Sequence, residues 1–232
     1  MSQPLSPPGT DPDFDRFEAA VLAVFSGASP PPLLDELATL PVAQFDTCVL
    51  HLEHTQRVEV RFYALQALHG LVAGTNYGLL DEGRKQRARG DLLALGRSGD
   101  DDDDEIRAAQ MPLFIRNKLA QVIVAIAAAE YPATWPTFFT DVLASLNERQ
   151  LSIDCFSRIL ISIHEDIISL EVPRSAAGAK ASMTFKDAMR DGPDAALERV
   201  ARAWLEVLKA LLGMIGVGGD RGARVGAGAS PA

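Results

Sequence analysis

The chain has 232 residues, of which 47% are hydrophobic and 6% aromatic, and its formal net charge at pH 7 is −9. This length and apolar content suffice to bury a sizeable core, in one or two domains. The acidic balance argues against a module that grips nucleic-acid phosphates by itself.

Cysteine usage and apolar run length indicate where the protein works. Cys48 and Cys155 lie far apart within apolar helical patterns, which predicts free thiols in a reducing nuclear or cytoplasmic setting. The longest uncharged apolar run, Leu119 to Ala129, is shorter than the ~20 residues that span a bilayer. The amino terminus also lacks a basic start followed by an apolar core. We therefore expect a soluble, unsecreted protein without a membrane partner.

Along the chain, residues 1–12 are rich in Pro, Ser and Gly and are predicted to be disordered. Three segments with apolar residues at helical spacing follow. Their apolar positions are Phe14, Phe17, Val21, Leu22 and Phe25, then Phe45, Cys48, Val49 and Leu52, then Val58, Phe62, Leu65 and Val72. Residues 79–95 form a more polar predicted helix that contains Gly83 and Gly90, each costing about 1 kcal/mol against alanine. We expect this helix to be the least regular.

An acidic segment, RSGDDDDDE, lies within residues 96–106. A calcium loop needs glycine at its sixth position and glutamate at its twelfth, but counting from Asp100 these places hold Glu105 and Met111. Blocks of like charge repel one another, so the segment is predicted to be a solvated acidic loop.

The richest pattern runs from Met111 to Leu146 and predicts a helical hairpin. Pro112 suits a first helical turn, Tyr131-Pro132 ends the first helix, and Pro136 opens the second. The second helix has one broad apolar face, made by Trp135, Phe138, Phe139, Val142, Leu143 and Leu146. Because the connection is short, we expect the two helices to lie antiparallel.

Three further helices are predicted after this hairpin. Apolar spacing predicts one from Phe156 to Ile167, ended by Pro173, and another from Ala179 to Arg190. The last has one apolar side formed by Leu197, Val200, Trp204, Val207, Leu208 and Leu211. Residues 213–232 carry no helical pattern and are predicted to be a disordered Gly/Ala-rich tail.

No strand or hairpin-turn signal interrupts this series of helices. Several helices are apolar on two faces, and units of about 40 residues are typical of HEAT-like repeats. The predicted fold class is therefore an all-α, HEAT-like α-solenoid of antiparallel helical hairpins over residues 13–212. Self-similarity between the units is weak, so this prediction also draws on a family resemblance.

The resemblance is carried by FIRNKLAQVIVAIAAAEYPATWPTFFTDVL at residues 114–143 and VRFYALQALHGLV at 60–72. Both segments resemble helices near the amino end of the exportin branch of importin-β-like nuclear transport receptors. KDAMR at 186–190 and SRILISIHEDI at 157–167 are similar to the exportin-T branch, which exports tRNA. The likeness covers about residues 14–212.

The resemblance implies the amino-terminal segment of an export receptor that shuttles between nucleus and cytoplasm. Its implied partners are the GTPase Ran in its GTP form, tRNA held mostly by repeats outside this segment, and nuclear pore proteins. The residues that the resemblance implies as Ran-facing candidates are Arg57, Arg61, Gln66, Arg116, Asn117, Lys118 and Gln121. Arg116 and Lys118 lie near a helix start, where the helix dipole disfavours cations. Alternatively, Asn117 and Gln121 hydrogen-bond neighbouring helices or turns, while the charged ends of Arg116 and Lys118 extend to water.

The RNA-facing candidates are Lys186, Arg190, Arg199 and Arg202. Surface salt bridges with Asp187, Asp191 and Glu198 would explain these cations equally well.

Catalytic and metal-binding signals are weak. Cys48, His51 and His54 recur at helical spacing but lack a fourth ligand, so no metal or cofactor is predicted. None of the common hydrolase, phosphate-loop or metalloprotease motifs occurs, so we do not expect an enzyme. Two hypotheses remain: an export receptor segment, or a helical-repeat scaffold that binds a protein partner without Ran or RNA.

Overall fold

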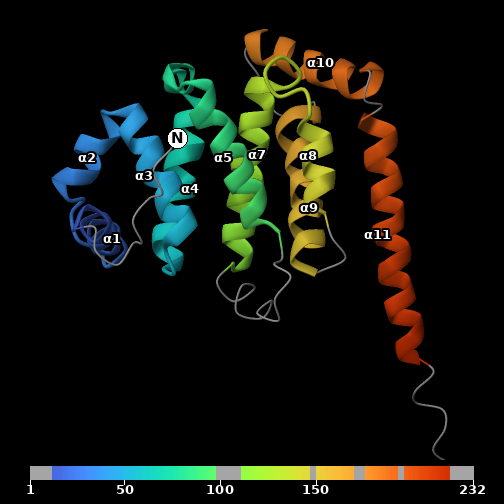
Figure 1. The fold of residues 1–232 in the computed structure, drawn as a ribbon, viewed down its shortest axis with the longest axis horizontal. Coiled ribbons are helices and arrows are strands. Elements are labelled where there is room, and N and C mark those ends of the chain that lie inside the picture. Colours follow the sequence, from blue (N-terminus) through green and yellow to red (C-terminus); the bar gives the residue numbers. More distant parts are fainter. Residues whose placement is uncertain (1–11, 98–110, 147–149, 170–175, 193–195, 220–232) are drawn as a thin grey trace, which may run out of the picture. The chain divides into compact units, whose positions relative to one another are not determined.

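The computed structural model describes residues 12–97, 111–146, 150–169, 176–192 and 196–219 (Figure 1). Within these ranges every regular element is a helix, which agrees with the predicted all-α class. The chain divides into two units, residues 1–186 and 187–232. Among the residues that the structure describes, no helix is long and apolar enough to cross a membrane.

The helices of the first unit follow the predicted order, although α9 begins at Gln150, six residues before the predicted Phe156. In chain order they are α1 (Pro12–Phe25), α2 (Pro32–Ala38), α3 (Pro41–His54), α4 (Val58–Ala73), the 3₁₀ helix η1 (Thr75–Leu79), α5 (Glu82–Leu95), α7 (Leu113–Glu130), α8 (Phe138–Ser145), α9 (Gln150–Ser162) and the π-helix η2 (Ile163–Ile168). Two further helices follow, α10 (Ala176–Asp191) and α11 (Ala196–Gly219).

The helices of the first unit stack in two rows. In the first row α1 contacts α4, α4 contacts α7, and α7 contacts α9. In the second row α3 contacts α5, and α5 contacts α8. The rows are joined by the pairs α3 with α4, α5 with α7 and α8 with α9 (Figure 1). Helix pairs that each contact the next pair are the arrangement of a helical-repeat fold, as predicted.

The central predicted hairpin needs one correction. A short turn joins α7 to α8 as expected, but α7 makes its most extensive contacts with α4 and α9, and α8 packs mainly on α5 and α9. The turn therefore connects two successive repeats rather than closing one. Apolar spacing shows which faces of a helix are buried, but it does not identify the helix that covers each face.

Two local predictions are wrong. Helix α5 is regular: Asp81 caps it by accepting the backbone N–H of Arg84 at 3.0 Å, and there is open space around Gly90. The irregular helix is instead the end of α9, which passes into the π-helix η2. Helix α11 continues to Gly219 rather than ending near residue 213, because helix extension costs little once a helix exists. Residues 1–11, most of the acidic segment and residues 220–232 lie outside the described residues.

A buried ionic network fixes the carboxyl end of α7. Glu130 is 3% exposed, and its Oε1 accepts a 2.7 Å hydrogen bond from the Tyr77 hydroxyl of η1. Its Oε2 lies 2.6 Å from Nε of Arg89 on α5, and Arg89 also donates to Glu82 at 2.7 Å. The Arg89 guanidinium lies 5.4 Å from the ring centre of Trp135. Burial and the hydrogen bond to Glu130 raise the pKa of the Tyr77 phenol above its ordinary value.

Glu130 and Trp135 belong to the sequence motif that carries the family resemblance, so that part of the motif has a structural role. The neighbouring aromatic residues form a cluster in which the Tyr131 ring centre lies 5.3 Å from Phe139 and 5.0 Å from Phe185 of α10. The network and the cluster together link α5, α7 and α8 near the carboxyl end of α7.

Replacing Glu130 by Gln is expected to lower the free energy of unfolding by about 3 kcal/mol, because it leaves the Arg89 charge buried without its main partner. Tyr77→Phe should cost about 1 kcal/mol, since it removes one hydrogen bond. Urea unfolding followed by circular dichroism measures both values. Arg190→Ala is the control, because its ion pairs are exposed to solvent and should contribute almost nothing measurable. Equal losses in all three variants would contradict this role for the network.

Candidate functional site

A series of phenylalanine rings crosses the first row of helices. The ring centres of Phe25 on α1 and Phe62 on α4 lie 6.5 Å apart, and those of Phe62 and Phe114 on α7 lie 5.5 Å apart. Both contacts are edge-to-face, a favourable geometry for aromatic pairs. Phe25 is 50% exposed and Phe114 is 49% exposed. Three neighbouring helices of the first row, α1, α4 and α7, therefore present connected aromatic rings to solvent.

Two exposed amides lie on the same surface. Gln66 follows Phe62 by four residues on α4, and Asn117 follows Phe114 by three on α7, so each amide shares a helix face with a ring. We call the surface formed by Phe25, Phe62, Gln66, Phe114 and Asn117 the aromatic–amide face. Exposed aromatic rings beside hydrogen-bonding side chains are typical of protein-binding surfaces.

Helix α9 closes one edge of this face with a charged cluster. Asp154 accepts hydrogen bonds from Arg116 of α7 at 2.6 Å and from Arg158 at 2.8 Å. Arg158 in turn donates to the Asn117 side-chain oxygen. Hydrogen bonding to Asp154 raises the pKa of the Arg158 guanidinium. These contacts hold Asn117 in place and tie α7 to α9.

The remaining Ran-facing candidates split between surface and interior. Arg57 is exposed and pairs with Glu18 of α1 at 3.0 Å. Arg61 is 7% exposed and donates to the carbonyl of Thr55 at 2.8 Å. Lys118 is also buried, 3.4 Å from the Gln121 side-chain oxygen, and burial lowers the pKa of its ammonium group. Arg61 and Lys118 are therefore poorly placed to touch a partner directly.

Among the Ran-facing candidates, Gln66 and Asn117 lie on the aromatic–amide face and Arg116 lies beside it. The alternative explanation, hydrogen bonding to neighbouring helices, accounts for some of these candidates. Asn117 does bond a neighbouring helix, as that alternative expected. Sequence reasoning missed the contacts between the three phenylalanine rings, because Phe25 and Phe62 fall within apolar stripes that predict burial. It also missed Asp154 and Arg158, for which the i, i+4 acid–base spacing was an available signal.

Two of the four RNA-facing candidates, Arg190 and Arg202, lie beside carboxylates. Arg190 pairs with Asp187 at 3.1 Å and with Asp191 at 2.7 Å. Arg202 pairs with Glu198 at 2.6 Å. These are the pairs that the salt-bridge alternative predicts, and every one of them is exposed to solvent.

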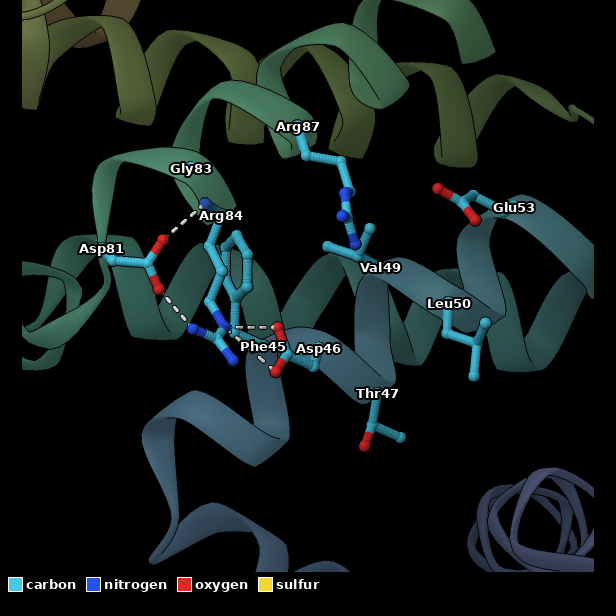
Figure 2. A pocket seen from close by; sticks show the side chains of 10 residues that line it. All are labelled: Phe45, Asp46, Thr47, Val49, Leu50, Glu53, Asp81, Gly83, Arg84 and Arg87. Carbon is cyan, nitrogen blue, oxygen red and sulfur yellow. Dashed lines mark hydrogen bonds and ion pairs between the residues drawn. The ribbon is translucent and has the colours of Figure 1, made fainter. Parts of the chain in front are cut away.

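The second row carries a different surface, a groove of about 590 Å³ between α3 and α5 (Figure 2). Its apolar lining comes from Phe45, Val49 and Leu50. Arg84 is held within it by Asp46 at 2.9 Å and by Asp81, while Arg87 reaches from α5 toward Val49. The charges of this groove are thus largely balanced by each other.

A carboxyl pair lies next to this groove. Glu53 of α3 and Asp91 of α5 both line a neighbouring cavity of about 470 Å³. The pKa of Asp91 is raised to about 6, mainly by burial. A hydrogen bond with Glu53 and the negative charge of Glu53 also raise this pKa, whereas the positive charge of Arg87 lowers it. Asp91 is therefore held in an environment that favours its neutral form.

The histidine and cysteine side chains have structural surroundings. Both ring nitrogens of His51 lie near backbone carbonyls, 2.8 Å from Thr47 and 3.2 Å from Phe14, and its ring stacks 4.1 Å from that of Phe14. Cys48 is fully buried, and burial raises the pKa of its thiol to about 12. No group of three or more potential metal ligands occurs among the described residues.

Comparison with known proteins identifies the family. A family model described as Exportin 1-like protein matches residues 112–212. Exportin-T of Oryza sativa is 32% identical over 174 residues, covering 75% of the chain and 16% of that relative. Exportin-T of Dictyostelium discoideum is 30% identical over 204 residues, covering 84% of the chain and 18% of that relative. The chain belongs to the exportin family.

Arabidopsis thaliana exportin-T is a further exportin relative, 29% identical over 162 residues, or 69% of the chain. The chain spans about a sixth of the length of these exportin-T relatives. No solved structure shows a significant match to it. Exportins are transport receptors rather than enzymes, which agrees with the prediction from the missing catalytic motifs.

Asp91→Asn is expected to stabilise the protein near pH 7.5 and to make almost no difference near pH 3. Because the pKa of Asp91 is raised in the folded state, its stabilising contribution is complete below the ordinary carboxyl pKa and is lost as the pH rises through about 6. The asparagine stays neutral throughout. Partial exposure limits the gain at high pH to about 1 kcal/mol.

Urea unfolding at three pH values measures this difference. Glu36→Gln is the matched control, because Glu36 is exposed on α2. A constant difference between wild type and Asp91→Asn at every pH would contradict the raised pKa.

Proposed function

We propose that this chain forms part of a nuclear export receptor for tRNA and that its aromatic–amide face contacts Ran in the GTP-bound form. The proposal is supported by the exportin-T relatives and by one structural observation: exposed, connected phenylalanine rings with amides beside them on three successive helices. A receptor of this kind shuttles between nucleus and cytoplasm.

The chemistry of the face suits a protein partner. Phe25 and Phe114 offer rigid apolar area that is already ordered by ring contacts, so little side-chain entropy is lost on binding. Gln66 and Asn117 can donate and accept hydrogen bonds beside the rings. Arg116 and Arg158 supply positive charge at the edge, although Asp154 offsets part of it. Such a face would bind by contact and would need no covalent chemistry.

In this proposal tRNA is held mainly by other parts of the receptor. The segment has a net charge of −9, and two of the RNA-facing arginines, Arg190 and Arg202, are already paired with carboxylates. Binding of Ran and of cargo would then strengthen each other through a shared conformation of the helical stack, a reciprocal coupling between sites. The alternative remains a repeat scaffold that binds another protein without Ran or RNA.

Pull-down of this chain with Ran loaded with GTP or with GDP tests the first part. We expect clear preference for the GTP form, and Phe114→Ala should weaken binding about tenfold or more, as for an exposed aromatic anchor. Leu79→Ala is the matched control, because Leu79 is 65% exposed on η1 and outside the face. Circular dichroism checks that both variants stay folded. Equal recovery with both nucleotides would favour the scaffold.

Titration of tRNA against salt by fluorescence anisotropy tests the second part. We expect weak binding whose salt dependence corresponds to no more than about two phosphate contacts. Arg190→Glu combined with Arg202→Glu should reduce it further. Tight binding with a steep salt dependence would show instead that this segment holds much of the RNA.

A further inference from the structure

Helix α1 is joined to the turn between α3 and α4 through one acidic side chain. Glu18 of α1 has a side chain that is only 15% exposed, and its Oε1 accepts a hydrogen bond from the Thr55 hydroxyl. Its Oε2 accepts a 3.0 Å hydrogen bond from Nε of Arg57. Thr55 follows the last residue of α3, and Arg57 precedes the first residue of α4. One carboxylate therefore holds both sides of the turn.

The turn is itself held in place by further hydrogen bonds. Thr55 is 1% exposed, and its hydroxyl oxygen accepts the backbone N–H of Arg57 at 3.2 Å. The carbonyl of Thr55 accepts a 2.8 Å hydrogen bond from the buried guanidinium of Arg61. The backbone N–H of Thr55 donates to the carbonyl of His51 at 2.9 Å. Glu18 is thus bound to a rigid support, and the buried cation Arg61 has a role in that support.

Glu18 and Phe25 lie on the same side of α1. They are seven residues apart, which is two helical turns or about 10 Å along the axis. At the far end of this distance the Phe25 ring meets Phe62 of α4, with ring centres 6.5 Å apart. A swing of α1 by about 10° around Glu18 would move Phe25 by about 2 Å, enough to break a ring contact.

The apolar contacts of α1 do not fix this angle by themselves. Phe17 and Val21 are buried in a cluster with Leu34 and Val60. Burial of apolar area is non-directional, so such a cluster tolerates small rotations of the helix. Hydrogen bonds to a carboxylate require a defined distance and direction, and those from a charged donor are among the strongest in proteins. The orientation of α1 is therefore determined at Glu18.

We propose that Glu18 is a positioning residue: through Thr55 and Arg57 it holds α1 at the angle that brings Phe25 into contact with Phe62. In this role Glu18 touches no partner and acts through Phe25, and Arg57 serves the same contact from the other side. The importance of this for Ran rests on the proposed function of the aromatic–amide face. The positioning itself can be measured without any partner.

Nuclear Overhauser contacts between the phenylalanine rings of the full chain test the positioning. Glu18→Gln removes the ion pair with Arg57, and Thr55→Val removes the hydroxyl donor at nearly unchanged volume. We expect both variants to lose the contact between Phe25 and Phe62. The contact between Phe62 and Phe114 should remain, because it does not involve α1.

The matched control is Glu59→Gln, since Glu59 is an exposed acid on α4 and lies outside the turn. It should leave both ring contacts unchanged, and circular dichroism checks that every variant stays folded. Retention of the Phe25–Phe62 contact in both test variants overturns the proposal. Loss of both ring contacts together in a folded variant also overturns it, because it indicates a general loosening of the stack.

A double-mutant cycle extends the test to binding. If Ran in its GTP form binds, Glu18→Gln should weaken binding several-fold in the wild-type chain and have no further effect in a Phe25→Ala chain, because its influence passes through that ring. Equal weakening in both backgrounds contradicts the positioning role. If Ran does not bind, the proposed function fails, and the ring contacts still decide whether Glu18 positions Phe25.

Discussion

Helix α7 must be covered on several sides, and the rest of the first unit follows from this constraint. Ile115, Leu119, Val122, Ile123 and Ile126 form one nearly inaccessible stripe, and the buried Ala120, Val124 and Ala127 extend the buried surface around most of the helix circumference. A helix of this kind cannot lie on a surface, so it takes α4 and α9 as neighbours in its own row and α5 from the other row. Its end carries Glu130, a buried acid at the terminus where the helix dipole disfavours negative charge. Arg89 and Tyr77 compensate for that charge and thereby fix α5 and η1.

The same packing determines which side chains remain at the surface. Residues that face neighbouring helices are buried by the stacking. Arg61 and Lys118 carry positive charge, yet both are buried in this way. Residues on the outer side of the first row remain available, and there the aromatic rings of Phe25, Phe62 and Phe114 come into contact because α1, α4 and α7 are successive members of that row. A possible binding surface is thus a by-product of stacking order.

Much of the fold could be predicted from the sequence, since periodic apolar residues and prolines locate most helices within a few positions. Pairing could not: the short Tyr131–Thr137 connection suggested that α7 and α8 form a hairpin unit, but contacts over longer sequence distances decided the partners. The candidate site was predicted only in part. Gln66 and Asn117, which the resemblance implies as Ran-facing, are exposed, but whether they face Ran stays a prediction. Phe25 and Phe62 look like core residues in the sequence, because apolar spacing does not distinguish a buried position from a half-exposed one. The π-helix at Ile163–Ile168 has no sequence signal that we can identify.

The contacts between the phenylalanine rings also depend on how far the repeat array is bent. Each ring comes from a different helix, so the separation between rings depends on the angle between neighbouring repeats, and a small change of that angle would part the rings while every helix stayed intact. A ligand that needs the rings in contact would select one degree of bending of the repeat array. Affinity at this surface would then depend on the angles between neighbouring repeats of the first unit.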